Sequence, residues 1–169
     1  MKRRELLAGA AGLGVVGTIS YLTFLDDRTG AVDAYTIETI DAPGSEAGET
    51  TVPTGDEPTL VTFFATSCPV CSAMMPTFRD LHAETDVRFV SVTNEPVGYT
   101  VERSEVVEWW RDHEGEWTVG IDSALELTGA LDVSSVPHTI VIDADRRPVF
   151  SKAGSIPRGE LRQAIEDAR

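Results

Sequence analysis

Residues 60–76 read LVTFFATSCPVCSAMMP, an apolar run followed by two cysteines and then by a helix-like run that contains one proline. The first six residues are mostly β-branched or aromatic, a composition typical of a strand that is buried on both faces of a sheet. Pro69 suits the first turn of a helix, where its missing N–H would have had no partner. The stretch therefore predicts a buried strand, a turn that carries the cysteines, and a helix over residues 68–83.

The start of the predicted helix bears on the chemistry of the two cysteines. Cys68 lies at the helix N-terminus, where unpaired backbone N–H groups and the helix dipole favour a thiolate over a thiol. Cys71 lies one turn further on and can attack a mixed disulfide that forms at Cys68. The pattern predicts that Cys68 attacks a substrate and Cys71 resolves the intermediate. The Cys68–Cys71 disulfide would then be the redox group, with no bound cofactor.

Two motifs together resemble those of the thioredoxin-like superfamily. The segment LVTFFATSCPVC, with Pro76 eight residues after the first cysteine, is similar to that family's active-site segment. Residues 133–143, VSSVPHTIVID, are similar to the segment in which the family carries a cis-proline before a central strand, at Pro137 here. The long spacing between the motifs resembles the TlpA/ResA-like branch. The resemblance implies an α/β, thioredoxin-like fold over residues 35–169, with a central mixed β-sheet flanked by helices.

The resemblance also implies roles for residues beside the cysteines. Pro137 would hold the preceding backbone near the thiols, and Val136 would pair through its backbone with a substrate peptide. His138, which directly follows Pro137, and Glu95, which follows a predicted strand, are candidates for proton transfer or for tuning of the thiols. The alternative for His138 is an imidazole with a purely structural role, and for Glu95 it is a solvated loop charge.

Three positions depart from the family pattern. Ser67 stands where the family usually has tryptophan, Thr62 where thioredoxins bury an acid, and Met74 where some ResA-like proteins have glutamate. The usual carboxylate proton shuttles are therefore missing from both of the latter places.

The rest of the region after residue 34 alternates between strand-like and helix-like segments. Ser123-Ala-Leu-Glu126 is a capping-box pattern that predicts the start of a short helix. Trp109 and Trp110 are adjacent in a predicted helix, so we expect only one of them to face the sheet and the other to lie at the surface. Predicted strands cover residues 35–40, 87–93, 117–121, 138–143 and 148–152, with a short extended piece at 50–52, and predicted helices cover residues 104–113, 123–130 and 157–168.

The composition is acidic and poor in lysine. The formal net charge is −14, from 28 acidic and 14 basic residues, and only two of the basic residues are lysines. Such a surface repels phosphate, which excludes nucleic acid as a partner. The balance is typical of proteins from extreme halophiles, because molar salt shortens the screening length to about 3 Å. Both cysteines belong to one motif, so neither is available for a structural disulfide, and a zinc site would lack two ligands.

The N-terminal residues resemble an export signal. Basic residues at positions 2–4 precede residues 6–25, which carry no charge, and this layout predicts a signal or a membrane anchor whose N-terminus stays inside. The pair Arg3-Arg4 is similar to the start of a twin-arginine signal. The chain thus divides into a signal or anchor at 1–25, a linker at 26–34 and the thioredoxin-like domain at 35–169.

Together these features predict an extracytoplasmic thiol–disulfide oxidoreductase, membrane-anchored or secreted, that reduces protein disulfides and is reset by a membrane electron donor. In the family that it resembles, typical tasks include cytochrome c maturation. We expect the domain to be monomeric. Two alternatives stay open: a disulfide-forming oxidant of the same fold, and a Sco-like copper-binding chaperone that uses Cys68, Cys71 and His138.

Overall fold

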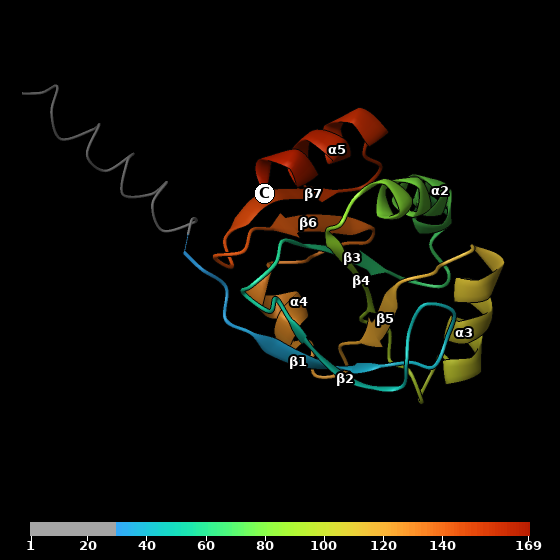
Figure 1. Cartoon of the computed structure of the whole chain (residues 1–169). Coiled ribbons are helices and arrows are strands. Elements are labelled where there is room, and N and C mark those ends of the chain that lie inside the picture. Colours follow the sequence, from blue (N-terminus) through green and yellow to red (C-terminus); the bar gives the residue numbers. More distant parts are fainter. Residues whose placement is uncertain (1–29) are drawn as a thin grey trace, which may run out of the picture. The chain divides into compact units, whose positions relative to one another are not determined.

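The computed structural model describes residues 30–169 (Figure 1). The predicted signal or anchor and most of the predicted linker lie outside these residues. Ala31–Arg169 form one compact unit, within which the Val32 N–H donates a hydrogen bond to the Arg146 carbonyl oxygen at 2.7 Å. Among residues 30–169, no helix is both long enough and apolar enough to span a bilayer.

Seven strands within this part of the chain form one mixed sheet, in the order β2-β1-β5-β4-β3-β6-β7. The pairs β3–β4 and β4–β5 are parallel, whereas the other neighbouring pairs are antiparallel. All six residues of β3 are buried, as predicted for a strand that is covered on both faces. The strands are β1 (Tyr35–Thr39), β2 (Gly48–Val52), β3 (Thr59–Phe64), β4 (Arg88–Thr93), β5 (Thr118–Ile121), β6 (His138–Ile142) and β7 (Pro148–Ala153).

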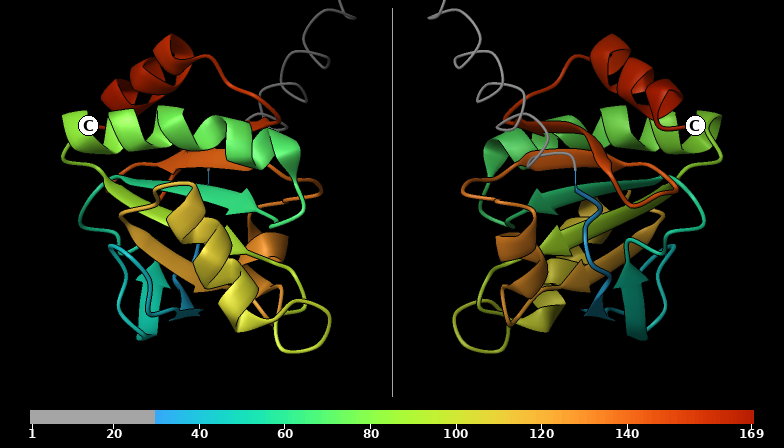
Figure 2. Two further views of the ribbon diagram at one scale, coloured as in Figure 1. Left: turned by 90° about the vertical axis from the view of Figure 1, so that its right-hand side faces the viewer. Right: turned by 90° about the vertical axis from the view of Figure 1, so that its left-hand side faces the viewer.

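Helices cover both faces of the sheet. Alternation along β3 sends Leu60 and Phe64 into a core with α2, α3 and α5, whereas Val61 and Phe63 pack in a second core with α4. Figure 2 shows α2 and α5 lying side by side. The result is the thioredoxin-like α/β fold that the sequence predicts. The helices of the described region are α2 (Pro69–Glu84), α3 (Arg103–Asp112), α4 (Glu126–Ala130) and α5 (Arg158–Asp167).

Helix α2 begins and ends within one residue of its predicted limits. Cys68 is the N-cap, and Pro69 lies in the first turn, as predicted. Pro76 lies inside the helix, where it removes one backbone donor. The buried residues recur at intervals of three or four, which places them on one face of the helix against the sheet. They are Cys71, Met74, Met75, Phe78 and Leu81.

The expectation that one of the adjacent tryptophans lies at the surface is wrong. Trp109 is 9% exposed and stacks on Phe64 with the ring centroids 4.7 Å apart. Trp110 is fully buried, lies 5.0 Å from the Trp117 ring, and donates from Nε1 to the Pro43 carbonyl oxygen at 2.9 Å. Both rings are covered because both lie near Phe64 on the sheet, and Trp110 also contacts Pro43 in the connection between β1 and β2.

The predicted capping box at Ser123 is also wrong. Helix α4 begins at Glu126, and Leu125 before it has a left-handed backbone, with φ of 57°. The cap comes from Asp122, whose Oδ2 accepts hydrogen bonds from the backbone N–H and the hydroxyl of Thr128, both at 2.7 Å. Asp122 is buried, so these bonds satisfy a carboxylate that would be costly to bury alone.

Strand β2 is longer than the short extended piece that the sequence predicts. It spans Gly48–Val52 because all five of its residues pair with β1. A cis peptide bond between Val52 and Pro53, which the sequence did not predict, follows the strand.

Candidate active site

Cys68 and Cys71 form a disulfide at the junction of β3 and α2, with their Cα atoms 5.2 Å apart. The chain turns sharply before them, because the Cys68 N–H donates to the Ala65 carbonyl oxygen at 3.1 Å. Cys68 is half-buried, whereas Cys71 is only 2% exposed. Cys68 is therefore the more accessible residue of the pair.

The first turn of α2 points a backbone donor at the sulfur of Cys68. The Cys71 N–H lies 3.1 Å from Cys68 Sγ, and no acidic residue stands in this first turn. An N–H group at a helix N-terminus stabilises negative charge on a nearby sulfur. The geometry therefore suits Cys68 as the thiolate of the pair, as the sequence predicts.

The peptide bond between Val136 and Pro137 is cis, which confirms the prediction for this proline. Pro137 is buried, and its carbonyl oxygen accepts a hydrogen bond from Gly154 N–H at 2.8 Å. Strand β6 begins directly afterwards, at His138, and pairs antiparallel with β3 so that His138 lies opposite Phe63. The start of β6 therefore lies beside the end of β3, at the edge of the sheet that carries the cysteine turn.

Two hydroxyls occupy the position where thioredoxins bury an acid. Thr62 and Thr139 lie opposite each other on β3 and β6, and their side-chain oxygens are 3.3 Å apart in the buried core. Met74 is buried as well, and its sulfur accepts a hydrogen bond from Ile156 N–H at 3.5 Å. Neither place offers a carboxylate to the cysteines.

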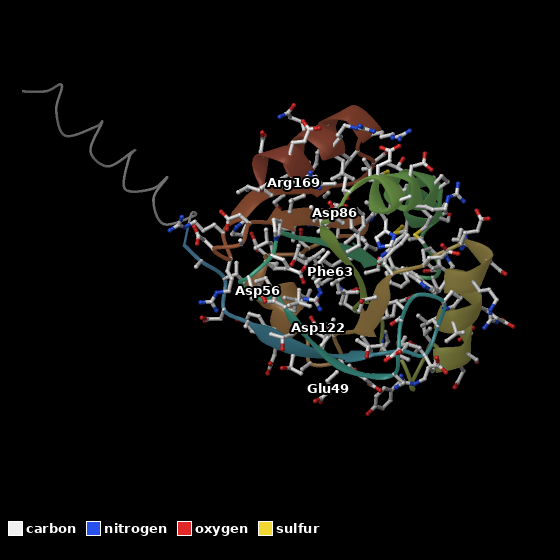
Figure 3. All side chains as sticks on the ribbon, in the orientation of Figure 1. Glu49, Asp56, Phe63, Asp86, Asp122 and Arg169 are labelled. Atoms are coloured by element: carbon white, nitrogen blue, oxygen red, sulfur yellow. A yellow bond between two sulfur atoms is a disulfide. The ribbon has the colours of Figure 1, made fainter. Side chains whose placement is uncertain are left out.

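The resemblance suggests His138 as a residue beside the cysteines, but its side chain lies on the face of the sheet opposite α2. Along β6 it alternates with Thr139, which faces α2, so the imidazole projects toward the α4 face, on which Phe63 also packs. Figure 3 shows Phe63 in the interior of the fold. His138 Nε2 lies 2.9 Å from Ser151 Oγ, and Nδ1 is buried with no hydrogen-bond partner among residues 30–169.

This placement bears on the copper-binding alternative. Cys71 belongs to the core beneath α2, whereas His138 projects from the opposite face of the sheet. The three side chains that the alternative requires are therefore not brought together. Within residues 30–169, no group of three or more His, Cys, Asp and Glu side chains is arranged to hold a metal ion.

We expect His138 to make folding stability sensitive to mild acid. Burial lowers the pKa of His138 below its ordinary value of 6.5, while the nearby charge of Asp132 opposes this shift. The unfolded chain therefore takes up the proton first, and the folded state loses stability as the pH falls below 6.5 toward the lowered pKa. Urea unfolding at pH 7.5 and pH 5 should show that the His138→Gln variant loses less stability than the wild type. Equal losses in the two proteins would contradict this assignment.

Glu95 lies at the turn before the cysteines rather than in solvent. Its Oε2 accepts hydrogen bonds from Thr66 N–H at 2.8 Å and from the Thr93 hydroxyl at 3.1 Å, and its Oε1 accepts from the Thr66 hydroxyl at 3.1 Å. Sequence reasoning selected Glu95 but missed its partner Thr66. The available signal was that β3 and β4 are consecutive parallel strands, whose C-terminal ends lie at the same edge of the sheet.

A disulfide at a helix N-terminus, with one accessible and one buried sulfur and a cis-proline loop at the same sheet edge, defines the thioredoxin-fold thiol–disulfide oxidoreductases. Residues 39–167 match the model of the Redoxin family. The chain therefore belongs to the Redoxin family, with Cys68–Cys71 as its redox pair. No curated protein matches the chain.

Several solved structures share the fold at low sequence identity. StoA from Bacillus subtilis is 18% identical, with a TM-score of 0.66 over 80% of this chain and 98% of that chain. A putative thiol:disulfide interchange protein DsbE from Chlorobium tepidum is 18% identical, with a TM-score of 0.70 over 84% of this chain and 97% of that chain. A thio-disulfide isomerase from Thermus thermophilus is 23% identical, with a TM-score of 0.67 over 83% of this chain and 95% of that chain.

Proposed function

We propose that this protein reduces protein disulfides outside the cytoplasm. The observation that carries the proposal is the asymmetry of the pair: Cys68 is accessible and receives a backbone N–H at its sulfur, whereas Cys71 is buried behind it. An accessible thiolate with a buried resolving thiol is the arrangement that disulfide exchange requires.

In the reducing direction the reaction has two exchange steps. The Cys68 thiolate attacks one sulfur of a client disulfide, so that a mixed disulfide forms and the other client sulfur leaves as a thiolate. The Cys71 thiolate then attacks Cys68 Sγ, which releases the second client sulfur and forms the Cys68–Cys71 disulfide. Two electrons have passed to the client. A membrane dithiol donor would supply two new electrons, by attacking the Cys68–Cys71 disulfide in two further exchange steps and becoming a disulfide itself.

The cis-proline loop would hold the client during the first step. The backbone groups of Val136 form none of the backbone hydrogen bonds found among residues 30–169, which leaves them for an extended client segment. Pro137 keeps this backbone at the edge of the sheet where the cysteines lie. Val70, in the first turn of α2, is 43% exposed and would add an apolar contact beside the disulfide.

Export is supported by residues 1–25, whose basic start and uncharged run have the layout of a signal or an anchor. Structural neighbours include a pneumococcal exposed lipoprotein and a secreted disulfide oxidoreductase from Mycobacterium tuberculosis. The net charge of −14 with only two lysines supports work at molar salt, where the repulsion among these charges is screened.

The reduction potential of the full chain tests the direction of electron flow. Equilibration with glutathione buffers, followed by alkylation of free thiols, should give a midpoint near that of thioredoxin, about −270 mV, together with catalysed reduction of a protein disulfide. A midpoint near about −120 mV with catalysed oxidation of client thiols would instead assign the oxidant. Stoichiometric Cu(I) binding by the reduced protein without disulfide exchange would assign the copper chaperone. Cys68→Ser is the inactive control for the exchange assays.

A further inference from the structure

We propose that Glu95 is a positioning residue, which holds the turn that carries Cys68 in place through Thr66. The proposal rests on the proposed disulfide exchange and adds a further residue to that site. Glu95 follows the end of β4, and Thr66 lies two residues before Cys68. Both hydrogen-bond donors of Thr66, its backbone N–H and its hydroxyl, donate to the Glu95 carboxylate.

The turn has little else to hold it. Thr66 is half-buried and Ser67 is exposed, so the small side chain at position 67 adds little packing to the turn. Within the turn, the backbone hydrogen bond from Cys68 N–H to the Ala65 carbonyl oxygen closes the loop but does not attach it to a neighbouring strand. The contacts with Glu95 supply that attachment, because they connect the turn to the end of β4.

Glu95 is itself held in position. The Thr93 hydroxyl accepts a hydrogen bond from Glu95 N–H at 3.2 Å and donates to Glu95 Oε2 at 3.1 Å. Thr93 is fully buried at the end of β4, in the interior of the sheet. Thr93 therefore holds the Glu95 carboxylate at Oε2 and attaches it to the end of strand β4.

The same geometry opposes a role for Glu95 in proton transfer. An ionised carboxylate only accepts hydrogen bonds, and here its two oxygens accept three, from Thr66 N–H, Thr66 hydroxyl and Thr93 hydroxyl. A proton shuttle has to exchange a proton with the reacting sulfur, whereas the three groups that contact this carboxylate belong to Thr66 and Thr93. The carboxylate acts on Cys68 through the backbone of residues 66–68.

The variants Glu95→Ala, Glu95→Asp and Glu95→Gln separate positioning from proton transfer. We expect Glu95→Ala to lower kcat for client reduction about tenfold with little change in KM, because a misplaced nucleophile affects the attack more than client binding. Glu95→Asp should resemble Glu95→Ala, since its carboxylate is one methylene too short to reach Thr66. Glu95→Gln should recover part of the rate, because its amide oxygen can still accept from Thr66 N–H.

Two further readouts isolate the role. The ratio of wild-type to Glu95→Ala rates should stay constant across pH, and alkylation of Cys68 by iodoacetamide at a pH where it is fully ionised should be unchanged. If the ratio of wild-type to Glu95→Ala rates falls to one at high pH and the Glu95→Asp variant is active, Glu95 transfers protons and the proposal is overturned. Glu108→Ala, at an exposed position on α3, is the matched control.

Wild-type activity distinguishes failure of the proposed function from failure of the positioning role. If the wild-type full chain catalyses no disulfide exchange, the proposed function fails and the positioning role, which rests on it, fails with it. If the wild type is active and Glu95→Ala matches it at every pH, the positioning role alone fails.

Discussion

Replacing Cys71 with serine should stop turnover and trap the client on Cys68 as a covalent mixed disulfide. Cys68 keeps its accessible sulfur and its place at the start of α2, so the first exchange step still proceeds. The serine hydroxyl cannot displace the client from Cys68 Sγ, so the second step is lost. We expect turnover to fall at least about a hundredfold. Non-reducing electrophoresis and mass spectrometry of the full chain should show the adduct.

The reciprocal variant is the control for this assignment. Cys68→Ser leaves only Cys71, which is 2% exposed and lies behind the turn, so it should trap no client. Reductant should release the adduct of Cys71→Ser and restore free client. Equal trapping by the two variants would show that either sulfur can attack, and trapping by Cys68→Ser alone would show that the two roles are reversed.

Trp110→Ala should have the largest effect on folding stability. The indole is fully buried, packs against Trp117 at 5.0 Å and Phe64 at 6.1 Å, and its Nε1 donates to the Pro43 carbonyl oxygen. Loss of a buried aromatic ring costs about 3–5 kcal/mol, from lost transfer energy and the cavity that remains. Because domains are stable by only about 5–15 kcal/mol, the variant should be marginal or unfolded. Urea unfolding in the salt at which the protein is active measures the difference.

Two other changes separate the ring from its hydrogen bond. Trp110→Phe keeps most of the apolar contact but leaves the Pro43 carbonyl oxygen without its donor, so a loss of about 1–3 kcal/mol is expected. Gly115→Ala should also lower the folding stability by displacing the Trp110 ring, since a Cβ at position 115 would lie 2.2 Å from that ring. A loss below about 1 kcal/mol for Trp110→Ala would mean that α3 contributes little to the core.

Local signals account for most of what could be predicted about the fold. The β-branched and aromatic run before the cysteines, the proline of the first helical turn and the spacing of apolar residues in α2 each act within a few residues. In most cases the predicted limits of the strands and helices lie within one or two residues of the observed limits. The wrong prediction of a capping box at Ser123 also has a local cause. Asp122 and Ser123 are adjacent candidates for the cap of α4, and the buried hydrogen bonds from Thr128 to Asp122 decide between them.

Contacts between distant residues account for the rest. The residue pattern was enough to predict the redox pair, its place between β3 and α2, and, through resemblance, the cis bond before Pro137. Strand pairing was needed to show on which face of β6 His138 lies and which carboxylate reaches the cysteine turn. Alternation along a strand shows only that neighbouring side chains point to opposite faces of the sheet. Which of these faces meets α2 depends on how β6 pairs with β3. The contact between Glu95 and Thr66 joins residues that are 29 positions apart, and it exists because β3 and β4 are parallel neighbours.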